Sequence, residues 1–116
     1  MGRSEKEYDC EKKEIMSFKI IIKAEARAEI INAFEWYESQ LAGLGTKFKS
    51  ELEYYLKRIQ SNPELFQNVY KDFQHAVLKK FPFRIFFTIN GTTIFIFGVF
   101  HTKRNPQIIA RRIRKR

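Results

Sequence analysis

The chain has 116 residues, of which 44% are hydrophobic and 16% aromatic, and it carries a formal net charge of +9. This apolar content excludes an intrinsically disordered chain, and the length suits a single domain with a modest core. No apolar run approaches the roughly 18 residues that span a bilayer. Cys10 is the only cysteine, so no disulfide can form within the chain. We therefore expect a soluble cytoplasmic protein with no membrane contact.

The two ends of the chain differ in charge. Residues 1–15 mix acids and bases, show no hydrophobic periodicity and contain no apolar segment of the signal-peptide type, so we expect a flexible extension. One domain then follows over residues 16–116. Its last part, residues 101–116, contains seven basic residues and no acidic one. Such a concentration favours an acidic partner, either nucleic acid or an acidic protein segment, and the alternative is a tail that only aids solubility.

The first half of the domain predicts one strand and two helices. Residues 17–23 form a β-branched run, which is typical of a strand. Apolar residues then recur at three- and four-residue spacing over residues 24–42, which predicts a helix that the GLG sequence at 43–45 ends. The expected apolar face of this helix consists of Ala26, Ile30, Ala33, Phe34, Tyr37 and Leu41. Thr46 is the expected N-cap of a second helix, which the Asn-Pro pair at 62–63 stops. The expected apolar stripe of this helix consists of Phe48, Leu52, Tyr55, Leu56 and Ile59. A loop this short makes the two helices an antiparallel hairpin.

The second half predicts a run of strands. Residues 66–81 alternate loosely and predict one or two strands, with Val77 and Phe81 pointing inward. Residues 83–90 and 92–101 predict two more strands, and a short helix is expected at the C-terminus. The order β-α-α-β-β-β groups the helices before the strands, so the sequence predicts an α+β fold with a mostly antiparallel sheet.

The last two strands predict a hairpin that is apolar on both faces. Asn90-Gly91 is the dipeptide favoured in a two-residue turn that needs φ > 0 at both positions, and this turn would pair Ile89 with Thr92. One face then carries Phe83, Ile85, Phe87, Ile89, Ile94 and Ile96. The other carries Arg84, Phe86, Phe95 and Phe97. A half-solvated sheet would alternate into polar residues, so we expect helices on one face and either a partner or the rest of the chain on the other.

The sequence offers little for metal or cofactor chemistry. His75 and His101 are far apart in the chain, and Cys10 lies in the expected extension. There is no recurring ligand spacing and no glycine-rich phosphate loop. We expect neither a metal nor a cofactor.

A basic surface remains at the sheet and at the end of the last strand, formed by Lys79, Lys80, Arg84, His101, Lys103 and Arg104. Cations with one histidine could cleave RNA, because the cations stabilise charge on the phosphate while the histidine moves a proton. The same set could bind nucleic acid through phosphates and stacked Phe rings, or it could dock an acidic protein segment. Composition does not choose among these three uses. Lys79 and Lys80 are adjacent, so as strand residues at most one would join a given surface.

Several short motifs occur in an informative order. They are Trp36-Tyr37-Glu38, Gln40, Gly43-Leu44-Gly45, Phe48, Asn62-Pro63, Phe66, the LKKFPF sequence at 78–83 and the VFHTKRNP sequence at 99–106. Together, from about residue 16 to residue 106, they resemble the RelE/ParE superfamily of bacterial type II toxins. The fold that this resemblance implies agrees with the one predicted from periodicity.

The resemblance implies a growth-inhibiting toxin held inactive by a cognate antitoxin. Antitoxins of this kind wrap a segment over the toxin, which would cover the apolar second face of the sheet. The toxin would meet operator DNA only indirectly, through the antitoxin.

The resemblance leaves the target open between two branches. RelE-like members cleave mRNA in the ribosome, and for that branch Arg84, His101 and Arg104 would be catalytic. However, no tyrosine follows Arg104, and His75 stands where many members have arginine. ParE-like members have a longer helical hairpin and are thought to poison DNA gyrase.

The hairpin with WYE and GLG, and the FPF strand, resemble the ParE-like branch more closely. We therefore expect a toxin without chemistry of its own that binds DNA gyrase. A ribosome-dependent mRNA endoribonuclease is the alternative, and a non-toxic protein that only binds its antitoxin is a third. The residues expected to contact the target or the antitoxin are Lys79, Lys80, Phe86, Phe95, Phe97, Lys103, Arg111 and Arg112.

Overall fold

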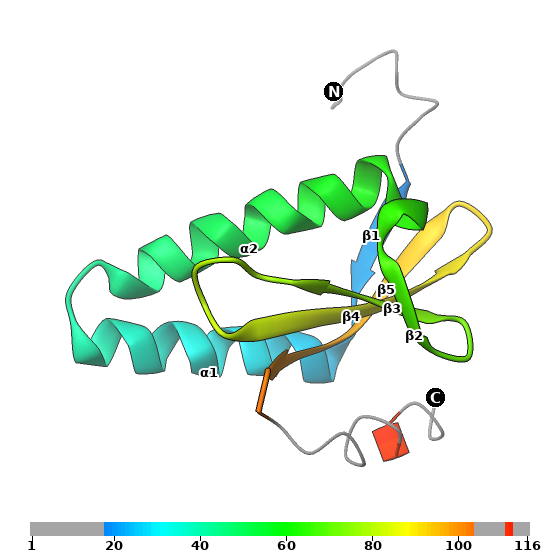
Figure 1. Cartoon of the computed structure of the whole chain (residues 1–116). Helices are drawn as coiled ribbons and strands as arrows, with labels where there is room; N and C mark the ends of the chain where they lie inside the picture. The colour runs from blue at the N-terminus through cyan, green and yellow to red at the C-terminus, as the bar shows by residue number, and fades with distance from the viewer. Residues whose placement is uncertain (1–17, 104–110, 113–116) are drawn as a thin grey trace.

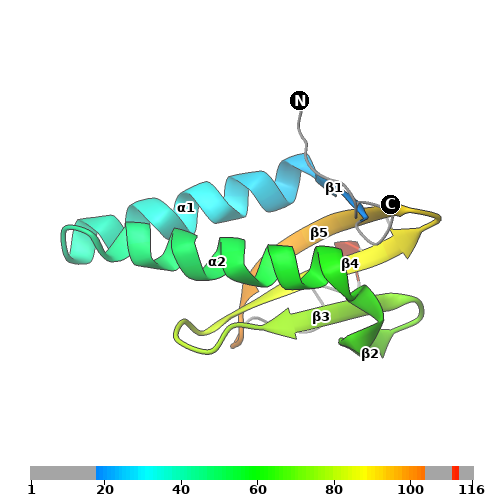
Figure 2. The ribbon, with the colours of Figure 1, turned by 90° about the horizontal axis from the view of Figure 1, so that it is seen from above.

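A helical hairpin packs on one face of a five-stranded sheet in the computed structural model, which describes residues 18–103 and 111–112 (Figures 1 and 2). The elements are β1 (Lys19–Ile22), α1 (Ala24–Gln40), α2 (Leu44–Ser61), the 3-10 helix η2 (Pro63–Leu65), β2 (Gln67–Tyr70), β3 (Phe73–Val77), β4 (Phe83–Asn90) and β5 (Thr93–His101). The predicted α+β class is confirmed. The expected extension at residues 1–15 and most of the expected C-terminal helix lie outside the described residues.

The strand order across the sheet is β1-β5-β4-β3-β2. Neighbouring strands are antiparallel except β1 and β5, which run parallel, so the sheet is mostly antiparallel as predicted. The loosely alternating segment contains two strands, β2 and β3. None of the helices in the described part of the chain is long and apolar enough to cross a bilayer.

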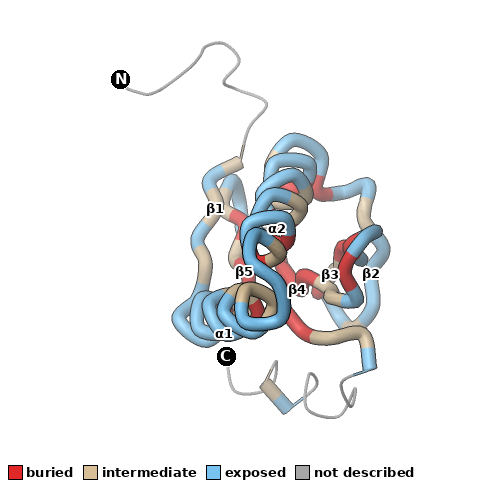
Figure 3. The backbone as a smooth tube through the Cα atoms, turned by 90° about the vertical axis from the view of Figure 1, so that its left-hand side faces the viewer, coloured by how far each residue is buried: buried red, intermediate tan, exposed pale blue. Residues whose placement is uncertain are grey.

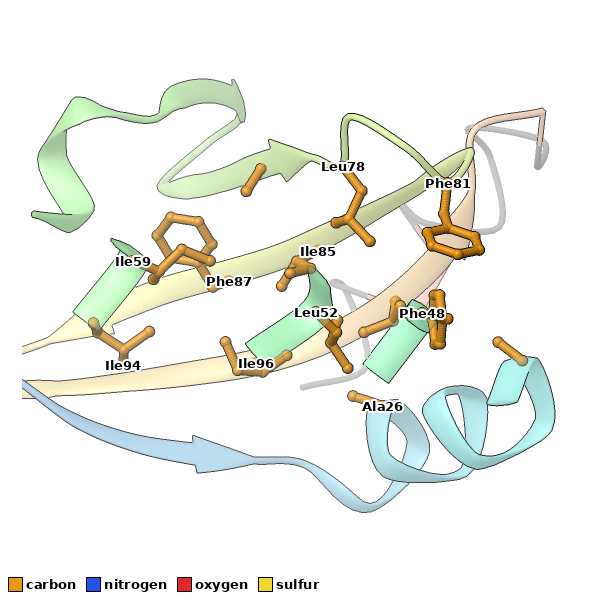
Figure 4. Close-up of a cluster of buried hydrophobic side chains, with 13 residues drawn as sticks. Ala26, Phe48, Leu52, Ile59, Leu78, Phe81, Ile85, Phe87, Ile94 and Ile96 are labelled. Carbon is orange, nitrogen blue, oxygen red and sulfur yellow. The ribbon is translucent and has the colours of Figure 1, made fainter. Parts of the chain in front are cut away.

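The main core lies between α2 and the inner face of the sheet (Figure 4). The predicted apolar stripe of α2 is confirmed, since Phe48 and Ile59 are fully buried and Leu52 is 3% exposed. From the sheet, this core receives Ile85, Phe87, Ile94, Ile96 and Val99. The sides of both helices that face away from the sheet are exposed (Figure 3).

Two residues that were predicted to point inward are exposed. Val77 is 48% exposed while Ala76 and Leu78 on either side of it are buried, so the inward positions of this segment fall one residue away from the predicted one. Leu41 is 64% exposed because α1 ends at Gln40 and the chain becomes extended there. Phe81, also predicted to point inward, is buried.

The loop between the helices is fixed by a carboxylate of α1. Gly43 adopts the left-handed conformation with φ of 90°, and α2 begins immediately after it, so Thr46 is not the N-cap. The Glu38 carboxylate accepts hydrogen bonds from the backbone N–H of Gly43 at 2.9 Å and of Gly45 at 3.0 Å. A Cβ on Gly45 would lie 2.7 Å from the carbonyl oxygen of Phe34, so glycine lets the two helices approach closely.

The turn of the β4–β5 hairpin is one residue later than predicted. Asn90 pairs with Thr93, so Gly91 and Thr92 form the two-residue loop. Gly91 has φ of 65°, and among the described residues Lys71 is the only non-glycine with positive φ. Positive φ at Gly91 but not at Thr92 is the pattern of a two-residue turn that needs glycine only at its first central position. The pairing shifts by two residues, so the predicted inner and outer faces are kept around the turn.

A β-bulge then changes the facing of the rest of β5. Phe86 pairs with Gly98 while Phe87 pairs with Ile96, so Phe97 is an extra residue in β5. Beyond the bulge the alternation is reversed. Val99 therefore joins the helix-side core, and Phe100 lies on the opposite face, which we call the outer face.

Candidate functional site on the outer face of the sheet

The outer face carries a small aromatic core of its own. Phe73, Phe86 and Phe100 are each at most 3% exposed, and Phe97 packs against them. Ring centroids lie 5.6 Å apart for Phe86 and Phe100, and 5.0 Å apart for Phe73 and Phe97. Phe86, which was predicted to bind a partner, is thus inside the protein, and its role in binding stays a prediction.

Arg84 and His75 lie together beside this cluster. The Cζ atom of Arg84 is 5.3 Å from the centroid of the Phe86 ring, and the His75 ring is 5.8 Å from it. His75 Nδ1 and Arg84 Nε are both buried without a hydrogen-bond partner among the described residues. Burial, and then the positive charge of Arg84, lower the pKa of His75, so this imidazole is neutral at pH 7. The side chains of His75 and Arg84 therefore form a pair in which each has a nitrogen available to hydrogen-bond a ligand.

His101 does not belong to this pair. It follows the bulge and pairs with Phe83, whose ring it contacts at 5.4 Å, so its side chain lies on the helix side of the sheet. Its Nδ1 accepts a hydrogen bond from the backbone N–H of Lys103 at 3.1 Å. The structure therefore puts Arg84 and His101 on opposite faces, and Arg104 lies outside the described residues. Without the bulge, strand alternation would have put Arg84 and His101 on one face.

One residue of the sequence indicates this arrangement. Gly98 is a glycine inside a strand, which often marks a bulge. A Cβ there would lie 2.5 Å from the nearest carbon of the Phe100 ring, so the ring occupies the space that a side chain would need. His75 was missed because its approach to Arg84 depends on the pairing of β3 with β4.

Two other predicted binding residues on this face lie under a lysine. Phe95 and Phe97 are half-buried, and Lys23 Nζ lies 5.6 Å and 5.5 Å from their ring centroids. Cation–π contacts of this length stabilise partly exposed aromatic rings. The two rings and the lysine present a mixed aromatic and basic surface.

Arg112, expected to contact a partner, is bound within the chain. Its Nη2 lies 2.9 Å from Glu29 Oε2, its Nη1 donates a hydrogen bond to the carbonyl oxygen of Phe97, and its Cζ lies 4.6 Å from the Phe100 ring centroid. Glu29 Oε1 also accepts the backbone N–H of Val99 at 3.0 Å. The side chains of this ion pair are less than one-fifth exposed. Where β5 extends past the end of β1, its backbone thus forms hydrogen bonds with the side chains of Glu29 and Arg112.

The remaining predicted cations lie elsewhere. Lys79 and Lys80 follow the end of β3 in the loop before β4, so the expectation that they point to opposite faces of a strand is wrong, and both line one groove beside α2. Lys103 and Arg111 are exposed. No group of three His, Cys, Asp or Glu residues that could hold a metal occurs in the described part of the chain.

Residues 20–106 match the family model of the ParE toxin of the type II toxin-antitoxin system, parDE. The chain belongs to this family. A search of curated proteins finds no match. Among solved structures, one titled "Chromosomal ParDE TA system from P. aeruginosa" superposes with a TM-score of 0.66 at 14% sequence identity, covering 74% of this chain and 97% of that chain. At this identity the likeness shows a shared fold.

The family match confirms the ParE-like branch of the predicted superfamily. A toxin of a type II toxin-antitoxin system has an antitoxin as its partner. In this ParE-family toxin, the Glu38 of the WYE motif and the glycines of the GLG motif make the hydrogen bonds that join the helices, so these motif residues have a structural role.

Proposed function

We propose that this ParE-family toxin inhibits growth in the cytoplasm by binding DNA gyrase, without chemistry of its own, and that a cognate antitoxin neutralises it. The match to the ParE toxin family supports the toxin role, and the observation that favours binding over RNA cleavage is the separation of Arg84 from His101. General acid–base cleavage of RNA needs its proton donor and its phosphate-binding cations around one reacting group. Two groups on opposite faces of a sheet do not meet that requirement.

The antitoxin would cover the outer face. Its aromatic side chains Phe95 and Phe97 are only half-buried, and Val77, which pairs with Arg84 two strands away from them, is 48% exposed. Apolar surface of this kind is stabilised when a partner removes it from water. The polar groups of Lys23 and Arg84 around these side chains would orient the partner.

A second function, RNA cleavage, is favoured by one observation. His75 is neutral and lies beside Arg84, and both have a buried nitrogen without a partner among the described residues. A neutral imidazole next to a cation can accept a proton while the cation holds a phosphate. This pair, and not His101, is the place to test for a nuclease.

The functions are separated by induction of the toxin in growing cells, with mapping of mRNA 5′ ends and of DNA breaks, and by a supercoiling assay with purified gyrase. For the gyrase function, supercoiling is inhibited, the antitoxin restores it, and mRNA stays intact. Cuts within translated codons, lost in His75→Ala and kept in His101→Ala, would establish the nuclease instead. Absence of growth arrest would identify a protein that only binds its antitoxin.

A further inference from the structure

A groove of about 720 Å³ lies between the N-terminal half of α2 and the loop that joins β3 to β4. Lys47, Glu51 and Tyr54 line it from α2, and Lys79 and Lys80 line it from the loop. The α2 residues follow at spacings of three and four, so they form one face of the helix. The groove lies outside the outer face described above and is within the size range of ligand-binding clefts.

The groove is held open by contacts on both sides of the loop. The backbone N–H of Lys80 donates a 2.7 Å hydrogen bond to Glu51 Oε2, which fixes the loop to α2. The next residue, Phe81, is buried, with its ring 5.4 Å from that of Phe48 (Figure 4). The backbone of Leu78 bonds across the loop to Phe83. The groove is therefore already formed before a partner binds, so the loop loses little conformational freedom on binding.

Two features of the groove determine the chemistry of a partner. Lys47, Lys79 and Lys80 are exposed, and none of these side chains has an ion pair among the described residues. Glu51 Oε1 is buried and has no hydrogen-bond partner in the same part of the chain. The rim thus favours anions, and the buried oxygen of Glu51 favours an uncharged N–H donor, since a cation would be repelled by the lysines.

We propose that this groove receives an acidic segment of the cognate antitoxin. Its carboxylates pair with Lys47, Lys79 and Lys80, one of its main-chain N–H groups donates to Glu51 Oε1, and an apolar side chain lies against Tyr54. A peptide supplies anions and N–H donors along the same backbone. A phosphodiester backbone has no N–H donor and carries a negative charge on every unit, so it would place a phosphate near Glu51 where a peptide can place an N–H group. The groove therefore favours a peptide over a nucleic acid. The inference rests on the proposed neutralisation by an antitoxin.

The test uses the full-length toxin and its cognate antitoxin, with calorimetric titration at several salt concentrations. The double variant Lys79→Ala/Lys80→Ala should bind roughly 10-fold more weakly, with a flatter dependence on salt, because ion pairs at the interface are removed. The matched control is Lys49→Ala/Lys57→Ala, which removes the same charge from exposed positions of α2 that do not line the groove. Labelled peptides that tile the antitoxin should show that the acidic one loses affinity for the variant.

Equal affinity of the groove variant and the control variant would overturn the groove proposal while leaving the toxin–antitoxin pair intact. No binding by the wild-type toxin would overturn the proposed neutralisation, and the groove proposal with it. A groove variant that keeps its affinity for the antitoxin but loses gyrase inhibition, or loses binding to a single-stranded oligonucleotide, would assign the groove to another partner and overturn the proposal.

Discussion

Removal of the Glu38 carboxylate, near the end of α1, is the most direct test of how the helical hairpin is held together. It accepts two backbone N–H groups at the start of α2, one exposed and one partly buried. Removing a capping side chain costs typically about 1 kcal/mol, and the loss of a negative charge near a helix N-terminus adds roughly 0.3–1 kcal/mol. For two capping bonds, we expect Glu38→Ala to lower the free energy of unfolding by roughly 2–3 kcal/mol.

The measurement is urea denaturation at pH 7, followed by circular dichroism. Glu38→Gln keeps one acceptor oxygen and should lose about half as much stability as the alanine variant, on the same capping scale. The control is Glu35→Ala, an exposed position of the same helix, which should change stability by no more than about 0.5 kcal/mol. If Glu38→Ala were indistinguishable from this control, the carboxylate would not fix the helical hairpin, and our account of the WYE and GLG motifs would be wrong.

Three further predictions concern the outer face. Gly98→Ala places a methyl group 2.5 Å from a ring carbon and should cost about 1–3 kcal/mol, so an unchanged melting temperature would contradict the assigned bulge. In a double-mutant cycle of Glu29→Ala and Arg112→Ala, we expect a coupling free energy of about 1 kcal/mol, whereas additive losses would mean that the ion pair contributes nothing. His75 has a lowered pKa in the folded state, because of burial and Arg84, so the unfolded chain binds the proton more tightly. Stability should therefore fall as the pH drops below about 6.5, the ordinary pKa of histidine, and a His75→Gln variant that lost as much stability in acid would refute this assignment.

The elements could be predicted from the sequence because apolar residues follow each period clearly. The stripe of α2 and the inner residues of β4 are buried as predicted, since a period of two or 3.6 fixes which side of an element is apolar. The faces of the hairpin were also right although its turn was wrong, because the pairing moved by two residues. Asn90-Gly91 and Gly91-Thr92 are both acceptable turns, and sequence alone did not distinguish them.

The candidate site was harder to predict because its geometry depends on one inserted residue. Phe97 adds a single position to β5, and this reverses the direction of His101, which strand alternation would otherwise put beside Arg84. The approach of His75 to Arg84 depends on the pairing of β3 with β4, and the contact of Glu29 with Arg112 joins positions far apart in the chain. Such contacts follow from sheet register and helix packing, which local patterns do not determine.

The ion pair of Glu29 and Arg112 has a consequence for how the protein can be handled and truncated. An unpaired stretch of strand backbone is a template on which other chains add and aggregate. Glu29 and Arg112 occupy the N–H of Val99 and the carbonyl of Phe97, so they block strand addition at that point of β5. A toxin truncated before Arg112 would lose half of this protection, and its tendency to self-associate should rise even though every strand of the sheet is still present.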